Sequence, residues 1–534
     1  MQQRSDVIVV GAGPTGLLLA GELAVQGVRV TVLERLAEPD PTIKSGSINV
    51  ASAEILDRRG LLPAAEEIQR RRMAAAGRFT AGGGTAVTRG LVGAFEDSAP
   101  RFPVMGHFAG IMFRNDLVDQ ADPVLASHTA VAGGIAVPQY DLELLLAERC
   151  ARLGVVVRRG VTVQGVRGDI LGDGDGDGGH GDGAVIVDTD AGEWSADWVV
   201  AADGGRSAIR KQLGVEFIGT APELVGYQAI ADFDATGLAH GWNWTPTGVY
   251  AYGPVAGRIL VARFGAQPED RDAPVTLAEL QEAVREVTGT NVTLKGIQGR
   301  ATRWSDNARR VGRYRHGRVL FAGDAAHVHS PFSAQGLNLG FGDAVNLGWK
   351  LAATIQGWAP AGLLDTYHAE RAPIADWVLD WTRAQVALMR GDERTRQLRA
   401  VVGDELFAVP GATNRMVALS SGIMQHYDVA DDAAAPVGSI VGDVLLTSGR
   451  RLADFAHDGR FVLIDRSADG RFADAVRLLD DRIVHVADPT AEPDRPSLLV
   501  RPDGIVIWAA HAADEPAEAT KRFATARLRW VGTH

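Results

Sequence analysis

Short apolar runs and a glycine-rich stretch alternate at the start of the chain. Asp6 to Val10 is an apolar run, Gly11 to Gly16 is glycine-rich, and Leu17 to Gln26 has helical periodicity. Val28 to Leu33 is a second run of β-branched residues. The order predicts a β-α-β unit, whose strands are buried in a parallel sheet of a doubly wound α/β domain.

Later segments change the pattern and then return to it. Trp198 to Arg210 and Arg318 to Lys350 read as further pieces of the first domain, so that domain is predicted to be discontinuous. Between them, Tyr227 to Phe233 and Gly248 to Phe264 alternate between apolar and polar residues, which favours an antiparallel sheet that covers a substrate.

A third unit is predicted from about Val409 onward, as a small α/β layer. Its expected strands are Phe461 to Asp465, Ile483 to Ala487, Ser497 to Val500 and Ile505 to Trp508, and its expected helices are Ala473 to Leu479 and Pro516 to Leu528. The predicted division is 1–71, 138–215 and 301–408 for the nucleotide-binding domain, 72–137 and 216–300 for the substrate-binding domain, and 409–534 for the C-terminal domain.

Composition excludes several classes of protein. The 534 residues are 46% hydrophobic and carry a formal net charge of -12, which argues against a nucleic-acid partner because binding phosphates needs a basic surface. The N-terminus has neither the long apolar stretch of a signal peptide nor a membrane span, so we expect no membrane partner and a cytoplasmic location. Cys150 is the only cysteine, which rules out an intrachain disulfide and a cysteine zinc cluster.

The glycine-rich stretch has the features of a dinucleotide site. Gly11, Gly13 and Gly16 follow a strand and open a helix, together with Pro14 and Thr15. Glycines let the backbone approach a pyrophosphate, and the helix N-terminus attracts its charge. Glu34 stands at the end of the second strand, where an acid accepts hydrogen bonds from ribose hydroxyls.

Two further motifs complete the pattern: Asp203-Gly204 within Ala202 to Arg210, and Gly323-Asp324, which Gln335 to Asn338 follow. With these three motifs in this order, essentially the whole chain resembles the class A FAD-dependent monooxygenases, the group of para-hydroxybenzoate hydroxylase and phenol hydroxylase, and especially the polyketide hydroxylases. The resemblance implies a Rossmann-like FAD domain of the glutathione-reductase type, and a thioredoxin-like C-terminal domain, here without redox cysteines.

The resemblance also assigns roles to individual residues. Asp324 is expected to bind the FAD ribitol, Asp203 and Gly204 to serve FAD and NADPH, and Gln139 to contact the flavin chain. The apolar helix from Asn338 to Ala352 is expected to direct its N-terminus at the flavin pyrimidine, where negative charge gathers on reduction. The other residues expected to contact the cofactor are Arg35, Lys44, Gly323, Gln335, Gly336, Leu337 and Asn338.

The implied activity is hydroxylation of a polycyclic aromatic polyketide, in antibiotic biosynthesis, by an enzyme that is a monomer or homodimer. The cosubstrates are O2 and a transiently bound NADPH, and the reaction runs through a flavin C4a-hydroperoxide. The protein orients the substrate and keeps water away.

Two departures from the family pattern leave the reaction open. Asn49-Val50-Ala51 replaces a frequent His-Ala-Arg, and Ser330 to Ala334 replaces a segment that is usually Pro-Pro-Thr-Gly-Gly. Ala51 and Ser333 therefore keep Baeyer-Villiger insertion, or another oxidative ring rearrangement, as an alternative. A non-catalytic flavoprotein is a more distant one. The candidates beside the flavin face are Pro331, Phe332 and Ser333, with no catalytic residue assigned.

Three other patterns in the sequence are each expected to have a structural role or a simple binding role. Trp242-Asn243-Trp244 is similar to a halogenase signature but lacks its isoleucine, so Trp242 and Trp244, like Tyr227, are expected to pack or to stack on a planar substrate. His327 and His329 have no third ligand at metal spacing, and no metal site is expected. The Gly-Asp repeats from Gly172 to Gly183 are expected to form a solvated hairpin tip rather than a calcium site.

Overall fold

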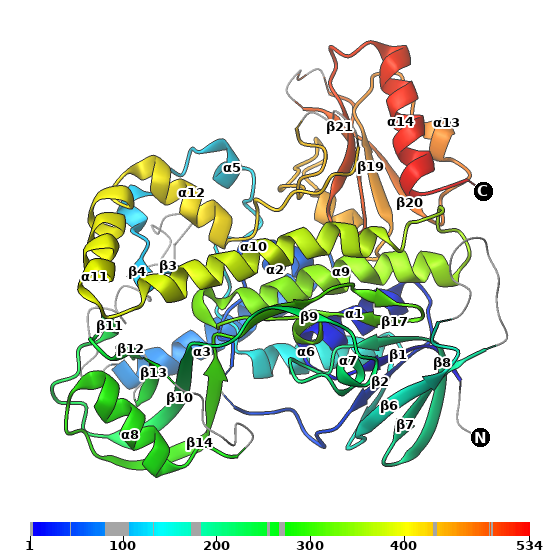
Figure 1. Cartoon of the computed structure of the whole chain (residues 1–534). Coiled ribbons are helices and arrows are strands. Elements are labelled where there is room, and N and C mark those ends of the chain that lie inside the picture. The colour runs from blue at the N-terminus through cyan, green and yellow to red at the C-terminus, as the bar shows by residue number, and fades with distance from the viewer. Residues whose placement is uncertain are drawn as a thin grey trace.

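The computed structural model describes residues 4–42, 44–80, 106–131, 133–171, 183–253, 257–265, 273–430, 435–490, 492 and 495–533. Helices α9 and α10 run between a large sheet below them and a smaller C-terminal sheet above them in Figure 1. A second sheet, which is antiparallel, lies at the lower left of the same view. The two helices span Gln335–Ile355 and Thr366–Leu388. They connect all three regions.

The large sheet contains the predicted β-α-β unit. Val7, Ile8 and Val9 are completely buried, as expected of a parallel strand that is covered on both faces. Helix α1 begins at Pro14 rather than at Leu17 and packs against α9. The strand order is β16 (Arg315–His316), β17 (Val319–Phe321), β8 (Gly192–Ala201), β1 (Ser5–Val10), β2 (Val30–Glu34) and β5 (Val156–Arg159), with β6 (Val163–Gly168) and β7 (Val185–Thr189) as an antiparallel extension beside β8.

The second sheet is antiparallel, as predicted, and helix α8 (Leu277–Thr288) covers one of its faces. Leu280, Val284 and Val287 recur at helical spacing and are buried against that face. The run from Gly248 to Phe264 forms two strands instead of one. The order is β11 (Gly241–Trp244), β12 (Gly248–Tyr252), β13 (Arg258–Phe264), β10 (Leu224–Phe233) and β14 (Leu294–Ser305).

The C-terminal sheet is mixed, with one parallel and two antiparallel pairs. Its order is β20 (Ile483–Ala487), β19 (Phe461–Asp465), β21 (Ser497–Val500) and β22 (Val506–Ala510), and its helices are α13 (Ala473–Val476) and α14 (Pro516–Trp530). Helix α12 (Pro410–Ser420) does not belong to this unit, since Val417 and Ala418 join the core of the large sheet. The predicted boundary at 409 therefore falls too early, because no local signal separates α12 from the C-terminal strands.

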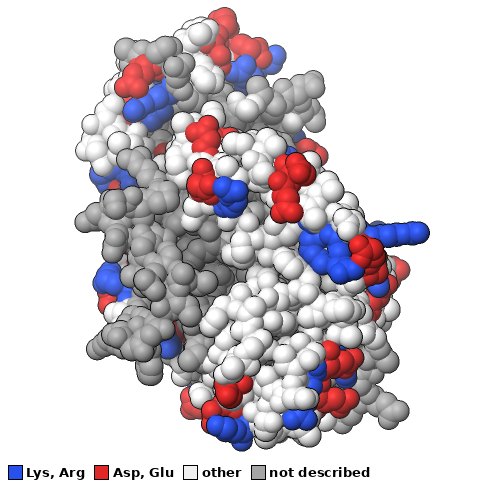
Figure 2. Space-filling model, turned by 90° about the vertical axis from the view of Figure 1, so that its left-hand side faces the viewer, with Lys and Arg blue, Asp and Glu red and all other residues white. Residues whose placement is uncertain are grey.

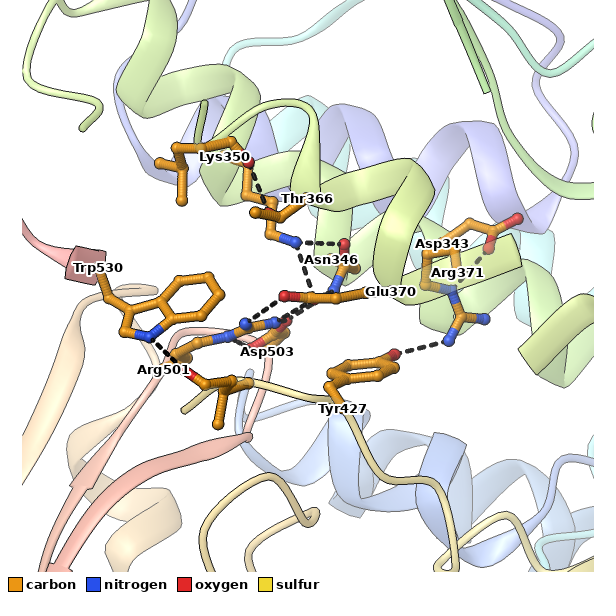
Figure 3. A network of polar contacts seen from close by, with 12 residues as sticks. Asp343, Asn346, Lys350, Thr366, Glu370, Arg371, Tyr427, Arg501, Asp503 and Trp530 are labelled. Carbon is orange, nitrogen blue, oxygen red and sulfur yellow. Dashed lines mark hydrogen bonds and ion pairs between the residues drawn. The ribbon is translucent and has the colours of Figure 1, made fainter. Parts of the chain in front are cut away.

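A buried ionic network joins the C-terminal sheet to α9 and α10 (Figure 3). The guanidinium of Arg501 donates to both carboxylate oxygens of Glu370, each at 2.8 Å, and its Nε donates to Asp503 at 2.9 Å. Lys350 approaches the same Glu370 at 2.8 Å. Burial alone would raise the pKa of Glu370, but the charges of Arg501 and Lys350 outweigh it and hold that pKa well below its usual range.

Shorter elements complete the described chain. Two small sheets are formed by β18 (His327–Val328), β15 (Ala308–Val311) and β9 (Phe217–Thr220), and by β3 (His107–Phe108) with β4 (Ile111–Met112). The remaining helices are α2 (Val50–Asp57), α3 (Leu62–Thr80), α5 (Pro123–Ala126), α6 (Gln139–Arg152), α7 (Ala208–Gln212) and α11 (Glu393–Ala400), with short turns η1 (Asn115–Leu117), η2 (Gly323–Ala325), η3 (Phe332–Ala334), η4 (Val401–Leu406) and η5 (Leu452–Phe455).

Charged side chains of both signs lie on the surface. Acidic and basic side chains on the face drawn in Figure 2 lie in small mixed groups, and its described residues form no continuous basic area. No helix in the described ranges has both the length and the apolar character that crossing a membrane requires. Residues 172–182 of the predicted hairpin tip lie outside the described part of the chain.

Candidate active site

The glycine-rich loop between β1 and α1 is tight on one side and open on the other. A Cβ added to Gly11 would lie 2.3 Å from the carbonyl oxygen of Ala202, and one added to Gly16 would lie 2.0 Å from that of Gly11. Gly13 has no atom within 4 Å of such a position. No side chain caps α1, where Pro14 occupies the first turn. The loop thus offers backbone and an uncapped helix end to a phosphate group.

Glu34 closes this loop at the end of β2. Its Oε2 accepts a hydrogen bond from the amide of Ala12 at 2.8 Å, and its Oε1 accepts one from Leu36 at 2.8 Å. Each carboxylate oxygen has a further lone pair, so the group can still accept a hydroxyl. The neighbouring Arg35 side chain is exposed. This geometry fits the ribose-binding role that the sequence predicts.

Lys44 and Gln139 lie at the edge of the same site. Lys44 forms an ion pair with Asp40 at 3.1 Å, and its charge counteracts the effect of burial on the pKa of Asp324 and of Glu143. Gln139 begins α6, where its side chain donates to Glu143 at 2.9 Å and its amide to the carbonyl of Ser45. Lys44 therefore pairs with Asp40, and the Gln139 carboxamide binds within its own helix.

Thr15 has a packing role that the motif does not reveal. A Cβ on Gly323 would lie 2.9 Å from Thr15 Oγ1, and one on Gly340 would lie 2.3 Å from it. The hydroxyl side of Thr15 is thus enclosed between η2 and α9. It holds the first and third motifs together instead of facing open space.

Replacing Gly340 with Ala should lower the free energy of unfolding by about 1–3 kcal/mol, because the new methyl group overlaps Thr15. Urea unfolding of the Gly340→Ala variant measures this loss. Gly296→Ala in β14 is the control, since nothing lies within 4 Å of its Cβ position. Adding Thr15→Ala should recover part of the loss, and strictly additive effects of the two changes would contradict the contact.

The second motif is tied to the third through an arginine. Asp203 accepts the amide of Ala208 with Oδ2 at 2.9 Å, while its Oδ1 is buried and has no partner in the described part of the chain. Burial raises the pKa of this carboxyl group. Gly204 has a φ of 84°, which favours glycine. Arg210 donates to the carbonyls of Ala325 at 2.8 Å and Gly205 at 2.7 Å, a link that motif reading missed.

Asp324 follows β17, as expected from the apolar run before it. Its side chain is accessible to solvent and accepts no hydrogen bond from any residue that the structure describes. Surrounding protein nevertheless desolvates the carboxylate and raises its pKa. An acceptor without a protein partner is available to hydroxyl groups of a ligand.

A buried carboxylate, which the sequence analysis did not select, fixes the backbone beside Asp324. Asp343 Oδ2 accepts the Gly323 amide at 3.0 Å and lies 2.6 Å from His327 Nε2, and Oδ1 accepts from Arg371 at 2.8 Å. Arg371 also donates to the hydroxyl of Tyr427 at 2.7 Å (Figure 3). Tyr427 belongs to the hydrophobic core of the C-terminal unit. His327 is thus part of a hydrogen-bonded chain that runs through Asp343 to Arg371, and the described residues contain no cluster that could hold a metal.

Helix α9 offers its backbone, while its first polar side chains bind protein. Gln335 donates to the carbonyl of Ser333 at 3.0 Å. Asn338 donates to the carbonyl of Ala334 at 2.7 Å and accepts the amide of Asn49 at 3.0 Å. No side chain caps the helix, so its N-terminal amides, including those near Gly336 and Leu337, remain suited to negative charge.

The loop from Pro331 to Ala334 meets an aromatic wall. The buried Phe332 ring lies 5.9 Å from Trp242 and 5.3 Å from Trp304, centroid to centroid. Trp244 lies on the same strand as Trp242, and its Nε1 donates to the carbonyl of Ala109 at 3.0 Å. Trp304, on β14, was not predicted, because no motif marks it.

Tyr227 lies on the opposite face of the same sheet. It is packed against α8 and its hydroxyl donates to Glu279 at 2.9 Å, whereas a Cβ on the preceding Gly226 would meet the Trp304 ring. Successive residues of a strand point to opposite faces. The expectation that Tyr227 contacts substrate stays a prediction, while its ring is buried against α8 on the face away from Trp304. Alternation predicts two faces but not which of them is covered by a helix.

The two departures from the family pattern have local explanations. Ala51 is buried and packs against Gly422, because a Cβ added to Gly422 would lie 3.1 Å from the Ala51 Cβ. Ser333 and Ala334 have φ angles of 60° and 52°. The backbone there is left-handed, which explains why glycines suit these positions in the resembling family.

These features define a flavoprotein, and comparisons with known proteins agree. Residues 4–382 match a family model described as an FAD binding domain, and residues 435–533 match one described as aromatic-ring hydroxylase, C-terminal. The chain therefore belongs to the FAD-dependent aromatic-ring hydroxylases and is a flavin-dependent monooxygenase.

Its relatives align over nearly their full length. Rifampicin monooxygenase of Streptomyces venezuelae is 37% identical over 526 residues, which are 96% of this chain and 96% of the relative. The 12-dehydrotetracycline 5-monooxygenase/anhydrotetracycline 6-monooxygenase of Streptomyces rimosus subsp. rimosus is 36% identical, with 99% of both chains covered. The solved structure of OxyS anhydrotetracycline hydroxylase from Streptomyces rimosus superposes with a TM-score of 0.80 at 35% identity, covering 99% of this chain and 100% of that one.

Proposed function

We propose that this enzyme uses NADPH and O2 to hydroxylate a polycyclic aromatic polyketide. The observation that carries the proposal is the aromatic wall of Trp242, Trp304 and Phe332, whose rings pack edge to face around the loop that follows the Asp324 motif in the sequence. The names of the relatives support the substrate class, since rifampicin and anhydrotetracycline are both large antibiotic-related molecules.

The residues present fit FAD. The open side at Gly13 and the uncapped α1 suit the pyrophosphate, Glu34 suits the ribose, and Asp324 has free acceptor capacity for the ribitol. The N-terminus of α9 favours negative charge close to it. When bound, FAD supplies the redox chemistry with O2.

The protein's own part is binding, orientation and exclusion of water. The aromatic wall would hold the flat substrate, and the buried Phe332 ring would help to keep solvent from the reacting region. No side chain is assigned as acid or base. NADPH is proposed to bind transiently, because the sequence contains a single dinucleotide fingerprint.

The C-terminal unit is proposed to be thioredoxin-like and structural. Its strand order, with β19 and β21 in the centre and β19 parallel only to β20, supports this fold. The only cysteine, Cys150, is buried in α6, so this unit performs no dithiol chemistry. We further propose a cytoplasmic enzyme that acts as a monomer or homodimer.

The test uses purified holoenzyme with NADPH, O2 and either anhydrotetracycline or rifampicin as probe. We expect NADPH to bleach the flavin absorbance without oxygen, and a product with one added oxygen atom in air. A new hydroxylated carbon with an intact carbonyl supports hydroxylation, whereas a new ester carbonyl in the carbon spectrum establishes Baeyer-Villiger insertion. Absence of bleaching under all conditions would refute the proposed monooxygenase cycle.

A further inference from the structure

Three residues with strained backbone converge beside the aromatic wall. Ala109, Ser333 and Ala334 have φ angles of 54°, 60° and 52°, and they are the non-glycine residues with positive φ in the described part of the chain. Such conformations are costly and persist only where their surroundings enforce them. Ala109 and Gly110, both with positive φ, form the two-residue turn between β3 and β4, as a tight hairpin requires, and Ser333 and Ala334 follow more than 200 residues later. A contact that both segments share must therefore come from elsewhere in the fold.

Gln385, on α10, is that common contact. Its side chain is completely buried, and its Oε1 accepts the amide of Ala109 at 3.0 Å and lies 2.8 Å from the hydroxyl of Ser333. The same hydroxyl lies 2.7 Å from the carbonyl oxygen of His107, so its hydrogen can go to either acceptor. A single carboxamide oxygen therefore joins the turn at 107–110 to the loop at 331–334.

Both joined segments carry parts of the aromatic wall. The loop holds Phe332 against Trp242 and Trp304, and the turn holds His107 at 4.5 Å from Trp242, centroid to centroid. Trp244 bonds to the carbonyl of Ala109. Displacing either segment would therefore move an aromatic ring.

The carboxamide nitrogen of Gln385 is buried and has no hydrogen-bond partner among the described residues. Leaving a buried donor unsatisfied is unfavourable, so a side chain of this length is not chosen here for stability alone. An apolar residue of the same size would avoid that cost. The polar oxygen must contribute something else, namely the link between the two strained segments.

We propose that Gln385 is a positioning residue, which fixes the turn at 107–110 and the loop at 331–334 relative to one another and thereby holds the His107 and Phe332 rings in place against Trp242, beside the proposed site of the aromatic substrate. The statement about substrate rests on the proposed function. The mechanical link between the two segments does not, and it can be tested without any substrate.

The first experiment measures residue-resolved amide hydrogen exchange of the holoenzyme. In Gln385→Met, which keeps length but loses both polar atoms, exchange at Ala109 and at the amides from Phe332 to Gln335 should rise together, by about tenfold. Gln385→Glu keeps an acceptor for both donors and should stay within about twofold of wild type. Gln397→Met, at an exposed glutamine of α11, is the matched control and should change neither segment.

A rise at Ala109 alone, with the loop unchanged, would overturn the link, as would equal acceleration in Gln385→Met and Gln385→Glu. If Gln385→Met does not fold, Ser333→Ala removes the hydroxyl from the other end. It should accelerate exchange at both Ala109 and Phe332 if the link exists, and only at the loop if it does not.

The second experiment compares the fraction of NADPH consumption that leads to oxygenated product, with anhydrotetracycline as probe. We expect this fraction to fall at least fivefold in Gln385→Met while the FAD dissociation constant stays unchanged, because within the described residues Gln385 forms no hydrogen bond with the three cofactor motifs. An unchanged fraction would overturn the role in positioning. If wild type oxygenates nothing, the proposed function fails instead, and hydrogen exchange alone decides the link.

Discussion

Replacing Arg501 with Met is expected to lower the free energy of unfolding by about 3–5 kcal/mol, as for other buried ion pairs that lose one partner. The side chain of Arg501 is completely buried, and its removal leaves Glu370 and Asp503 without their main counter-charge. Lys350 compensates Glu370 only in part, since it reaches one carboxylate oxygen. Methionine also loses the contact of the guanidinium with the Trp530 ring, 4.7 Å from its centroid.

Urea unfolding, followed by tryptophan fluorescence and by circular dichroism, measures this loss. The matched control is Arg495→Met in the same unit, where the partner Glu492 is largely exposed and the pair is worth about 0–1 kcal/mol. A loss of about 1 kcal/mol or less for Arg501→Met would mean that the ionic network is no stronger than a surface pair.

Replacing Asp324 with Ala is expected to weaken FAD binding by about tenfold to a hundredfold for each hydrogen bond lost, because bonds to a charged acceptor contribute about 1.5–3 kcal/mol. The structure sharpens this expectation. Asp324 accepts no bond from the protein that is described, and its carboxylate is desolvated. Its removal should therefore leave the melting temperature of the apoenzyme unchanged or slightly raised.

Titration of FAD into wild-type and variant apoenzyme, with melting curves alongside, separates binding from stability. Asp380→Ala, at an exposed position of α10, is the control and should alter neither. Equal FAD affinity of wild type and Asp324→Ala would show that this carboxylate does not hold the cofactor. A lower melting temperature of the variant apoenzyme would assign it to the turn instead.

The sequence predicts the parts of this fold that depend on neighbours along the chain. Hydrophobic periodicity locates β1, α1, β2 and the C-terminal strands to within a few residues, because burial on both faces of a sheet demands continuous apolar runs. The glycine-rich loop and Glu34 are also predictable from residues that are close in the sequence. Their spacing is fixed by one local turn and two adjacent strands.

The rest depends on contacts between distant segments. The contact of Thr15 with Gly340 exists only once α9 is placed against it, and Tyr227 differs from its neighbours only once α8 covers its face. Asp343, Arg371 and Gln385 belong to no motif. Their roles arise where helices α9 and α10 meet loops from elsewhere, and periodicity reports only that such helices have a buried side.

The position of Asp343 implies a two-way energetic relation between the cofactor site and the C-terminal unit. One carboxylate oxygen orders the Gly323 amide beside Asp324, and the other holds Arg371, which bonds to Tyr427. Binding effects between two sites are reciprocal by thermodynamic necessity. Any free energy that the docked C-terminal unit adds to FAD binding is therefore returned by bound FAD as resistance of that unit to detachment.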